Sequence, residues 1–201
     1  MSSPQTHLAA VLGHELRNPL AGAVAGVAAA AELTEAGDPR RKLLERALDE
    51  LDRTAVTLDR YLDLGSGREP RRESTDLVAL ARDTVRRWDA VVVPSAARVV
   101  AEVDPVLLRQ ALDNLLQNAR QAGAASVEIQ VDIDRGRPVL IVIDDGPGIP
   151  AELREQVMTP FVSGRGGTGL GLALVGEIVD AHGGSVTIEP GEPGTRVRLQ
   201  L

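Results

Sequence analysis

The chain lacks cysteine and has almost no aromatic residues. Without cysteine among its 201 residues, disulfides and thiolate metal sites are excluded, although this absence is compatible with any compartment. Tyr61, Trp88 and Phe161 are the only aromatic side chains, which are too few for a platform on which nucleic-acid bases stack. We therefore expect a core built from leucine, valine, isoleucine and alanine.

A surplus of positive charge and a long hydrophobic run are also missing. The formal net charge of −7 argues against nucleic acid as a partner, because neutralising phosphates requires clustered lysine and arginine. The longest apolar run covers residues 20–31, whereas a membrane span needs about 20 apolar residues. The amino terminus does not have the basic and then apolar regions of a signal peptide. We expect no membrane segment in this chain and a cytoplasmic location.

The first third of the chain has the pattern of two helices. Apolar residues between 43 and 62 recur at alternating spacings of 4 and 3, which is a heptad seam for helix packing. A second apolar stripe lies in residues 8–31. Between the two, Gly37, Asp38 and Pro39 predict a helix end, an N-cap and a first helical residue. The seam residues are Leu44, Leu48, Leu51, Ala55, Leu58 and Leu62.

Two helices joined by a short turn predict a helical hairpin over residues 1–66. A hairpin alone cannot bury both faces of its seam, so we expect it to form a homodimer with a four-helix bundle. Residues 67–75 are mostly polar and predict a flexible linker. A second domain is expected at residues 76–201.

This second domain alternates helices and strands. Helical spacing is found at residues 77–88, 105–122 and 170–181, with Asp104 as the cap of the second helix. Strands are predicted at residues 126–133, 138–143, 185–188 and 196–201. We therefore predict an α+β chain, in which the helical hairpin is followed by an α/β sandwich with a mixed sheet and helices on one face.

A glycine-rich stretch at residues 163–172 suits phosphate. It leads into a predicted helix, where backbone N–H groups and the helix N-terminus receive anionic oxygens. It is not a dinucleotide-binding fingerprint, because no strand immediately precedes it, and it lacks the lysine of a P-loop. A mobile linker is the alternative interpretation.

Two further motifs suit a nucleotide. Asp144 follows a buried strand, where its carboxylate can accept a hydrogen bond from the exocyclic amine of a base; Asp-Gly is otherwise an ordinary turn. Asn114 and Asn118 are four residues apart and share a helix face. Their amide oxygens suit Mg²⁺ that bridges phosphates, and the alternative is that they are surface residues.

The three motifs occur in the order Asn114-Leu-Leu-Gln-Asn-Ala, Asp144-Asp-Gly-Pro-Gly and Gly167-Thr-Gly-Leu-Gly-Leu. This ordered set resembles the ATP-binding domain of sensor histidine kinases, whose superfamily includes DNA gyrase, mismatch-repair ATPases and a heat-shock chaperone. The resemblance implies that Asn118 holds Mg²⁺, that Asn114 supports the phosphates of ATP and that Asp144 binds the adenine amine. It also implies ATP-binding roles for Gly146 and Gly148 at the base, for Gly167, Thr168, Gly169, Leu170 and Gly171 at the triphosphate, for Phe161 before the lid, and for Thr195 near the adenine.

The first predicted helix carries a candidate phospho-acceptor. The segment His14-Glu-Leu-Arg-Asn-Pro-Leu resembles the phospho-acceptor box of the same family. Imidazole can attack a γ-phosphate through one ring nitrogen while the other nitrogen releases its proton, which Glu15 would accept. Asn18 would orient a water or the acceptor carboxylate, and Glu15 and Asn18 together resemble the family's phosphatase pattern. His7 and His182 are interpreted as ordinary surface or helix-ending residues.

These motifs predict the core of a two-component histidine kinase. We expect autophosphorylation of His14 by ATP with Mg²⁺, phosphotransfer to an aspartate of a response-regulator receiver domain, and phosphatase activity toward that regulator. Hydrolytic relatives carry glutamate where Asn114 stands, and an amide is no general base for water. The alternative is a dimeric scaffold that docks a response regulator and has a degenerate ATP site. A serine kinase of the anti-sigma type would not need the hairpin.

Two features depart from the family pattern. The expected ATP lid at residues 150–166 is short, so nucleotide gating is expected to differ. Gln121 and Ala122 stand where many members carry a basic and an aromatic residue, which removes possible contacts to phosphate and base.

Overall fold

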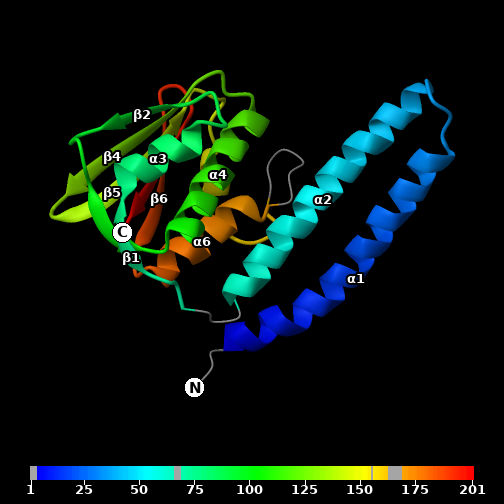
Figure 1. The fold of residues 1–201 in the computed structure, drawn as a ribbon, viewed down its shortest axis with the longest axis horizontal. Coiled ribbons are helices and arrows are strands. Elements are labelled where there is room, and N and C mark those ends of the chain that lie inside the picture. Colours follow the sequence, from blue (N-terminus) through cyan, green and yellow to red (C-terminus); the bar gives the residue numbers. More distant parts are fainter. Residues whose placement is uncertain (1–3, 66–68, 155, 163–168) are drawn as a thin grey trace. The chain divides into compact units, whose positions relative to one another are not determined.

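Two compact units make up the part of the chain that the structure describes. The computed structural model describes residues 4–65, 69–154, 156–162 and 169–201, with the backbone alone at residues 4–15 and 60–65. The units are Met1–Arg68 and Glu69–Leu201 (Figure 1). The first is a helical hairpin, and the second is an α/β sandwich.

Two long helices form the first unit. Helix α1 is Pro4–Leu33 and helix α2 is Pro39–Gly65, so the predicted hairpin is confirmed. The sequence pattern predicts that the first helix ends at Gly37, but α1 already ends at Leu33. Gly37 lies in the turn between the two helices and has a φ of 105°. Arg17 Nε and Asp59 Oδ1 form an ion pair of 2.5 Å between the helices. No helix in the described part of the chain is long and apolar enough to cross a membrane.

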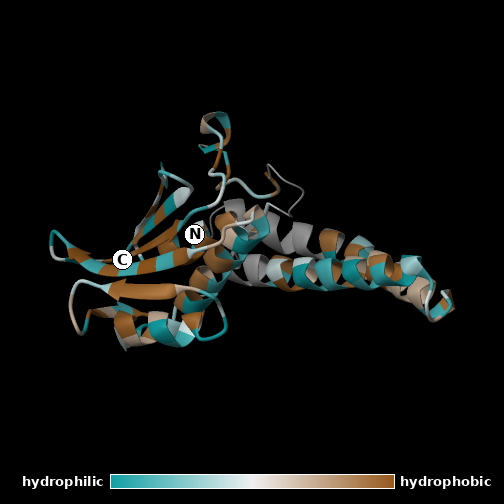
Figure 2. Ribbon diagram, turned by 90° about the horizontal axis from the view of Figure 1, so that it is seen from above, coloured by the Kyte–Doolittle hydropathy of each residue, from teal (hydrophilic) through white to brown (hydrophobic). Residues whose placement is uncertain are grey.

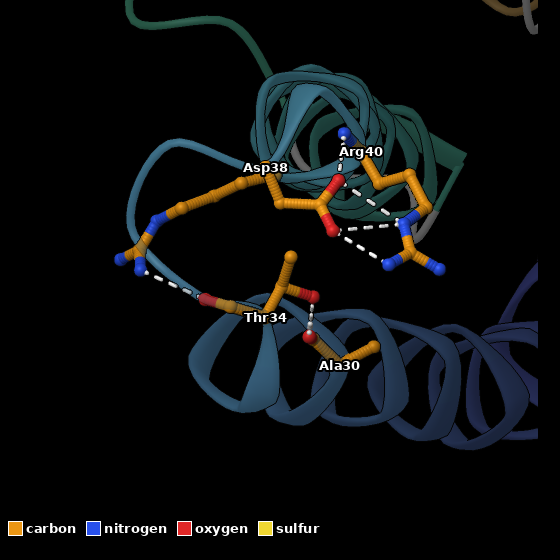
Figure 3. A network of polar contacts seen from close by, with 5 residues as sticks. Ala30, Thr34, Asp38 and Arg40 are labelled. Carbon is orange, nitrogen blue, oxygen red and sulfur yellow. Dashed lines mark hydrogen bonds and ion pairs between the residues drawn. The ribbon is translucent and has the colours of Figure 1, made fainter.

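A polar network holds the turn between the two helices (Figure 3). Arg40 N donates to Asp38 Oδ1 at 2.8 Å, and Arg40 Nη2 pairs with Asp38 Oδ2 at 2.6 Å. Hydrogen bonds from the Arg40 side chain and then its backbone hold the pKa of Asp38 below its usual range, so a charged carboxylate stands at the start of α2. Arg41 Nη1 donates to Thr34 O at 3.2 Å, and Thr34 Oγ1 donates to Ala30 O at 2.6 Å. Residues at the ends of both helices thus hold the turn.

A mixed five-stranded sheet forms the second unit together with its helices. The strand order is β2-β4-β5-β7-β6, in which β2 is parallel to β4 and all other neighbours are antiparallel. Hydropathy alternates along β4, β6 and β7, because successive side chains of a strand point to opposite faces, whereas β5 is almost continuously apolar (Figure 2). The strands are β2 (Val91–Pro94), β4 (Val127–Asp134), β5 (Arg137–Asp144), β6 (Ser185–Pro190) and β7 (Thr195–Gln200).

Helices cover one face of this sheet (Figure 1). They are α3 (Leu77–Val85), α4 (Pro105–Ala122) and α6 (Gly171–Ala181). The strand register places Val142 beside both Ile129 and Val197, and all three side chains are buried beneath the helices. The predicted fold class, a helical hairpin followed by an α/β sandwich with a mixed sheet, is confirmed.

Several short elements are missing from the sequence prediction. Besides β2, they are β1 (Glu73–Asp76) and β3 (Val100–Val103), which pair as a separate antiparallel sheet, and the short helix α5 (Ala151–Arg154). Strand β1 begins inside the stretch interpreted as a linker, and the helix expected at residues 77–88 ends at Val85. Four-residue elements are too short for a periodic pattern to reveal them.

Candidate nucleotide-binding site

Asn114 and Asn118 lie on neighbouring turns of α4. The helix is fixed on the sheet because its leucines recur on one face and are buried, among them Leu108, Leu112 and Leu116. The two asparagines are half-buried. Asn114 Nδ2 donates a hydrogen bond to the backbone oxygen of residue 110 at 2.9 Å. The amide oxygen of Asn114 can therefore accept a hydrogen bond from a ligand or bind a cation.

The first residue of α6 lies against Asn118. A Cβ atom added to Gly171 would be 3.1 Å from Asn118 Oδ1 and 3.3 Å from Asn118 Nδ2, so glycine permits this close approach. The preceding residue, Leu170, is buried and is the N-cap of α6. Leucine has no side-chain oxygen, so the side chain of this N-cap residue does not itself donate or accept a capping hydrogen bond at the start of α6. The predicted magnesium ligand and the predicted phosphate-binding helix start are therefore neighbours.

Asp144 and Asp145, at the end of β5, have different surroundings. Asp145 Oδ1 accepts hydrogen bonds from Ala125 N at 2.8 Å and Ser126 N at 2.9 Å, and so it fixes the loop before β4. Asp144 Oδ1 accepts from Gly146 N at 2.9 Å within its own turn, and Asp144 Oδ2 has no hydrogen-bonding partner among the described residues. Sequence reasoning missed the role of Asp145, because its partners Ala125 and Ser126 lie 20 and 19 positions earlier in the chain and no local pattern reveals that contact. The fold leaves Asp144 as the carboxylate that can receive a ligand.

The residues predicted around the base surround Asp144. Thr195 on β7 is buried and lies directly opposite Asp144 in the strand register. Gly194 has a φ of 99°, and a Cβ atom there would lie 1.7 Å from Asp144 O. A Cβ atom on Gly146 would be 2.8 Å from Asp144 Oδ1, and one on Gly148 would be 3.0 Å from Gly194 O. The turn after Asp144 and the start of β7 therefore approach each other so closely that there is no space for side chains at these glycines.

The end of α4 connects these two groups of residues. Ala122 is the last residue of α4, and its Cβ is 3.8 Å from the place that a Cβ of Gly146 would occupy. Asn118, one turn earlier, is adjacent to Gly171. The Asp144 turn and the start of α6 thus adjoin the same last two turns of one helix.

Phe161 and Gly169 meet just before α6. Phe161 N donates to Gly169 O at 3.1 Å, and the Phe161 side chain is 57% exposed. Gly169 has a φ of 68°, and a Cβ atom there would lie 2.5 Å from the carbonyl carbon of Phe161, so this contact requires glycine. Gly167 and Thr168, which were predicted to line the triphosphate, lie outside the described residues.

The candidate phospho-acceptor belongs to the hairpin. His14 and Glu15 lie in α1 where the backbone alone is described, and Asn18, one turn after His14, is exposed. The nucleotide-site residues belong to the second unit. The candidate phospho-acceptor and the candidate nucleotide site therefore belong to different units.

The amide oxygen of Asn118 is the candidate metal ligand of this site. Among them, no group of three or more His, Cys, Asp or Glu side chains is placed to hold a metal ion alone. Mg²⁺ is commonly held by one or two protein oxygens together with substrate phosphates. The amide oxygen of Asn118, beside the start of α6, fits that arrangement.

Comparison with known proteins covers both units. Residues 5–70 match the family of His Kinase A phospho-acceptor domains, and residues 103–201 match the family of histidine kinase-, DNA gyrase B- and HSP90-like ATPases. The sensory histidine kinase/phosphatase NtrB of Rhodobacter capsulatus is 32% identical over 96% of this chain and 61% of its own length. The crystal structure of full-length ShkA in complex with AMPPNP has a TM-score of 0.71 at 27% identity, covering 98% of this chain and 45% of ShkA. Histidine kinase ThkA, in complex with response regulator protein TrrA, shares the fold at a TM-score of 0.75 and 24% identity, covering 97% of this chain and 60% of ThkA.

A phospho-acceptor hairpin joined to a gyrase-type nucleotide unit defines a class of two-domain phosphotransfer proteins. The chain belongs to the sensor histidine kinases of two-component systems, so the resemblance found in its motifs is confirmed. It spans 61% of NtrB and 45% of ShkA.

Proposed function

We propose that this chain is a protein-histidine kinase core, which transfers the γ-phosphoryl group of ATP to His14 and then to an aspartate of a response-regulator receiver domain. The observation that carries this proposal is the arrangement at the end of α4, where Asn118 lies beside Gly171 and Gly146 lies beside Asp144. An ATP molecule along this helix end would find a carboxylate for its base and helix N–H groups for its phosphates.

In this proposal each group of residues binds one part of ATP. Asp144 accepts the hydrogen bond of the adenine amine through its available oxygen, and Thr195 contacts the base from the facing strand. Asn114 orients the phosphates through its amide oxygen. The amide oxygen of Asn118 would hold Mg²⁺, and the metal would supply positive charge next to the phosphates.

The nucleophile in this reaction is the imidazole of His14. A bond forms between one ring nitrogen and the γ-phosphorus, while the bond from that phosphorus to the bridging oxygen of ADP breaks. Glu15 accepts the proton that the other ring nitrogen releases. Asn114 stands where hydrolytic relatives have glutamate, and its amide cannot act as the base that would activate water instead.

The second step returns His14 to its starting state. The nitrogen–phosphorus bond breaks as a carboxylate oxygen of the receiver aspartate bonds to phosphorus. Asn18 is exposed on α1, one turn from His14, and would orient a water for hydrolysis of the receiver's acyl phosphate. Because ATP is a cytoplasmic substrate, we place these reactions in the cytoplasm.

A homodimer of the hairpin is part of the proposal. The heptad seam of α2 is half-buried at Leu44, Leu48 and Leu51 in the single hairpin, so apolar surface remains that a second copy would cover. Residues 1–66 would form this phospho-acceptor and dimerisation unit, residues 67–75 the connection, and residues 76–201 the ATP-binding domain.

The decisive experiment is autophosphorylation of the purified chain with γ-labelled ATP and Mg²⁺. We expect acid-labile, base-stable label in the wild type and in the controls His7→Ala and Gln117→Ala, and none in His14→Ala or Asn118→Ala. Label that survives in His14→Ala would mean that another residue is the nucleophile. ATP binding by calorimetry without any label would favour the scaffold alternative, in which the hairpin docks a regulator but the ATP site is inactive.

A further inference from the structure

A buried histidine joins α4 and α6 at the ends that are remote from the nucleotide site. His182 directly follows α6, and Asp104 directly precedes α4; both are buried. Asp104 N donates to His182 Nε2 at 2.9 Å, and His182 Nδ1 lies 2.7 Å from Ile178 O. A backbone N–H can only donate and a carbonyl can only accept, so the ring is neutral, with its proton on Nδ1.

The same junction completes the end of α6. A helix leaves its last four carbonyl groups without partners inside the helix. Here Ile178 O accepts a hydrogen bond from the ring N–H of His182, and the next two carbonyls accept hydrogen bonds from backbone N–H groups of residues 182–184 at 2.8 to 3.0 Å. Ala181 O accepts from Arg72 Nη2 at 3.0 Å. The helix end is therefore fixed by specific partners.

The start of α4 is fixed at the same place. Asp104 Oδ1 accepts from the N–H groups of Val106 and Leu107 at 3.0 and 3.1 Å, which is an N-cap. Asp104 Oδ2 accepts from Arg71 N at 2.9 Å. Asp104 thus ties α4 to the first residues of the second unit, while its own backbone N–H ties α4 to His182.

The opposite ends of the same two helices carry the nucleotide residues. Helices α4 and α6 pack side by side and antiparallel, with Asp104 near His182 at one end and Asn118 near Gly171 at the other. Asp104 and Asn118 are 14 positions apart in the sequence, which is about 21 Å along a helix. A helix is stiff over that length, so sliding at the junction becomes sliding at Asn118. A Cβ atom at Gly171 would be only 3.1 Å from Asn118 Oδ1, so the backbone of α6 passes close to Asn118 and a change of register alters this approach directly.

We propose that His182 is a positioning residue that sets the register of α4 against α6 and thereby the placement of Asn118 relative to the start of α6. The proposal rests on the proposed function, because its consequence is tighter binding of ATP at the far end. His182 does not touch the nucleotide; it acts through the Asp104 N–H and the two helices.

The first test compares two substitutions in the whole chain. Glutamine places an oxygen as far from its Cβ as the His182 Nε2, so His182→Gln keeps an acceptor for Asp104 N–H, whereas His182→Leu fills the space without one. We expect His182→Leu to weaken the affinity for ATP with Mg²⁺ about tenfold and His182→Gln to stay within about threefold of the wild type, because small misplacements are amplified at such sites. Val78→Ala, a core truncation in α3, is the stability control, and it should lower the unfolding temperature without changing the affinity for ATP.

Equal losses of affinity in His182→Gln and His182→Leu would overturn the proposal, and so would an equal loss in Val78→Ala. A second measurement does not depend on ATP. Amide hydrogen exchange of the nucleotide-free chain should become faster in His182→Leu at residues 114–118 and 171–174 as well as at the junction. Faster exchange at the junction alone would mean that His182 only caps a helix. If the wild type binds no ATP, the proposed function is wrong. Amide hydrogen exchange of the nucleotide-free chain would then still test whether His182 positions the two helices.

Discussion

The hairpin and the sandwich bury their apolar residues to very different extents. Among the described side chains of the hairpin, Ala31 and Leu58 are the only buried ones, whereas Leu112, Leu140 and Leu199 in the sandwich are completely inaccessible to solvent. Two helices touch along a single line, so each seam residue keeps one side exposed. A sheet covered by helices closes its own core. The difference indicates that the sandwich completes its core alone and that the hairpin needs a second surface.

Exposed apolar residues of the hairpin agree with this view. Leu33 is 87% exposed, and Leu43 and Val56 are also exposed, in a helix pair without any sheet to cover them. If a second copy covers the hairpin, its stability depends on protein concentration by mass action. The stability of the sandwich should not depend on it.

The largest expected effect tests whether the sandwich is stable on its own. Leu112→Ala removes a completely buried side chain of α4 and should lower the free energy of unfolding of the second unit by about 3 kcal/mol. Val106→Ala on the same helix, where the side chain is 74% exposed, should change it by less than about 0.5 kcal/mol. Denaturant unfolding at two protein concentrations measures both. Similar losses in the two variants, or a loss that varies with concentration, would contradict the comparison.

The next effect separates two glycines of the sandwich. Gly194→Ala places a Cβ atom on Asp144 O at a positive φ and should cost more than about 2 kcal/mol of stability and also weaken ATP binding. Gly183 also has a positive φ, of 76°, but open space surrounds the Cβ position there, so Gly183→Ala should cost only about 1 kcal/mol. Thermal unfolding measures both losses of stability, and equal losses would show that backbone strain outweighs the clash with Asp144 O at the end of β5.

The limits of sequence reasoning follow from the same contrast. Long periodic elements are predictable: the helix expected at residues 105–122 is observed as Pro105–Ala122, with Asp104 as its cap. The strand expected at residues 138–143 is observed as Arg137–Asp144. Strand β2, Val91–Pro94, owes its place to pairing with β4, far along the chain, and no local pattern contains that information.

The candidate site shows a similar division. The Asn114, Asn118 and Asp144 motifs could be found because residue type and spacing carry chemistry. The separate roles of Asp144 and Asp145 depend on which carboxylate faces the loop before β4, which only the folded chain determines. His182 has the sequence context of a helix-ending turn, and its bond to Asp104 spans 78 positions.

A smaller effect tests the hairpin. Leu44→Glu introduces a charge into the half-buried seam of α2 and should weaken homodimerisation at least tenfold, which is about 1.4 kcal/mol. Arg46→Glu introduces the same carboxylate at an exposed position outside the seam and should leave the dimer intact. Sedimentation or light scattering over a range of concentrations measures the association. If the wild type stays monomeric at every concentration, the inference that the hairpin, unlike the sandwich, needs a second copy to cover its apolar surface is wrong.

The smallest expected effect separates stability from ligand binding within the sandwich. Asp145→Ala loses two hydrogen bonds to the loop before β4, so the free energy of unfolding should fall by about 1 kcal/mol while the affinity for ATP stays near that of the wild type. Asp144→Ala removes a carboxylate whose one hydrogen bond from a described residue comes from its own turn, so stability should change less, while the affinity for ATP should fall at least tenfold. Calorimetry and denaturant unfolding on both variants measure the two quantities. If Asp145→Ala loses the ligand and Asp144→Ala keeps it, the loop before β4 rather than the turn after β5 receives the base. The two aspartates are adjacent in sequence and differ in where the fold directs their oxygens, so this reversal would place the nucleotide on the other side of the β5 terminus.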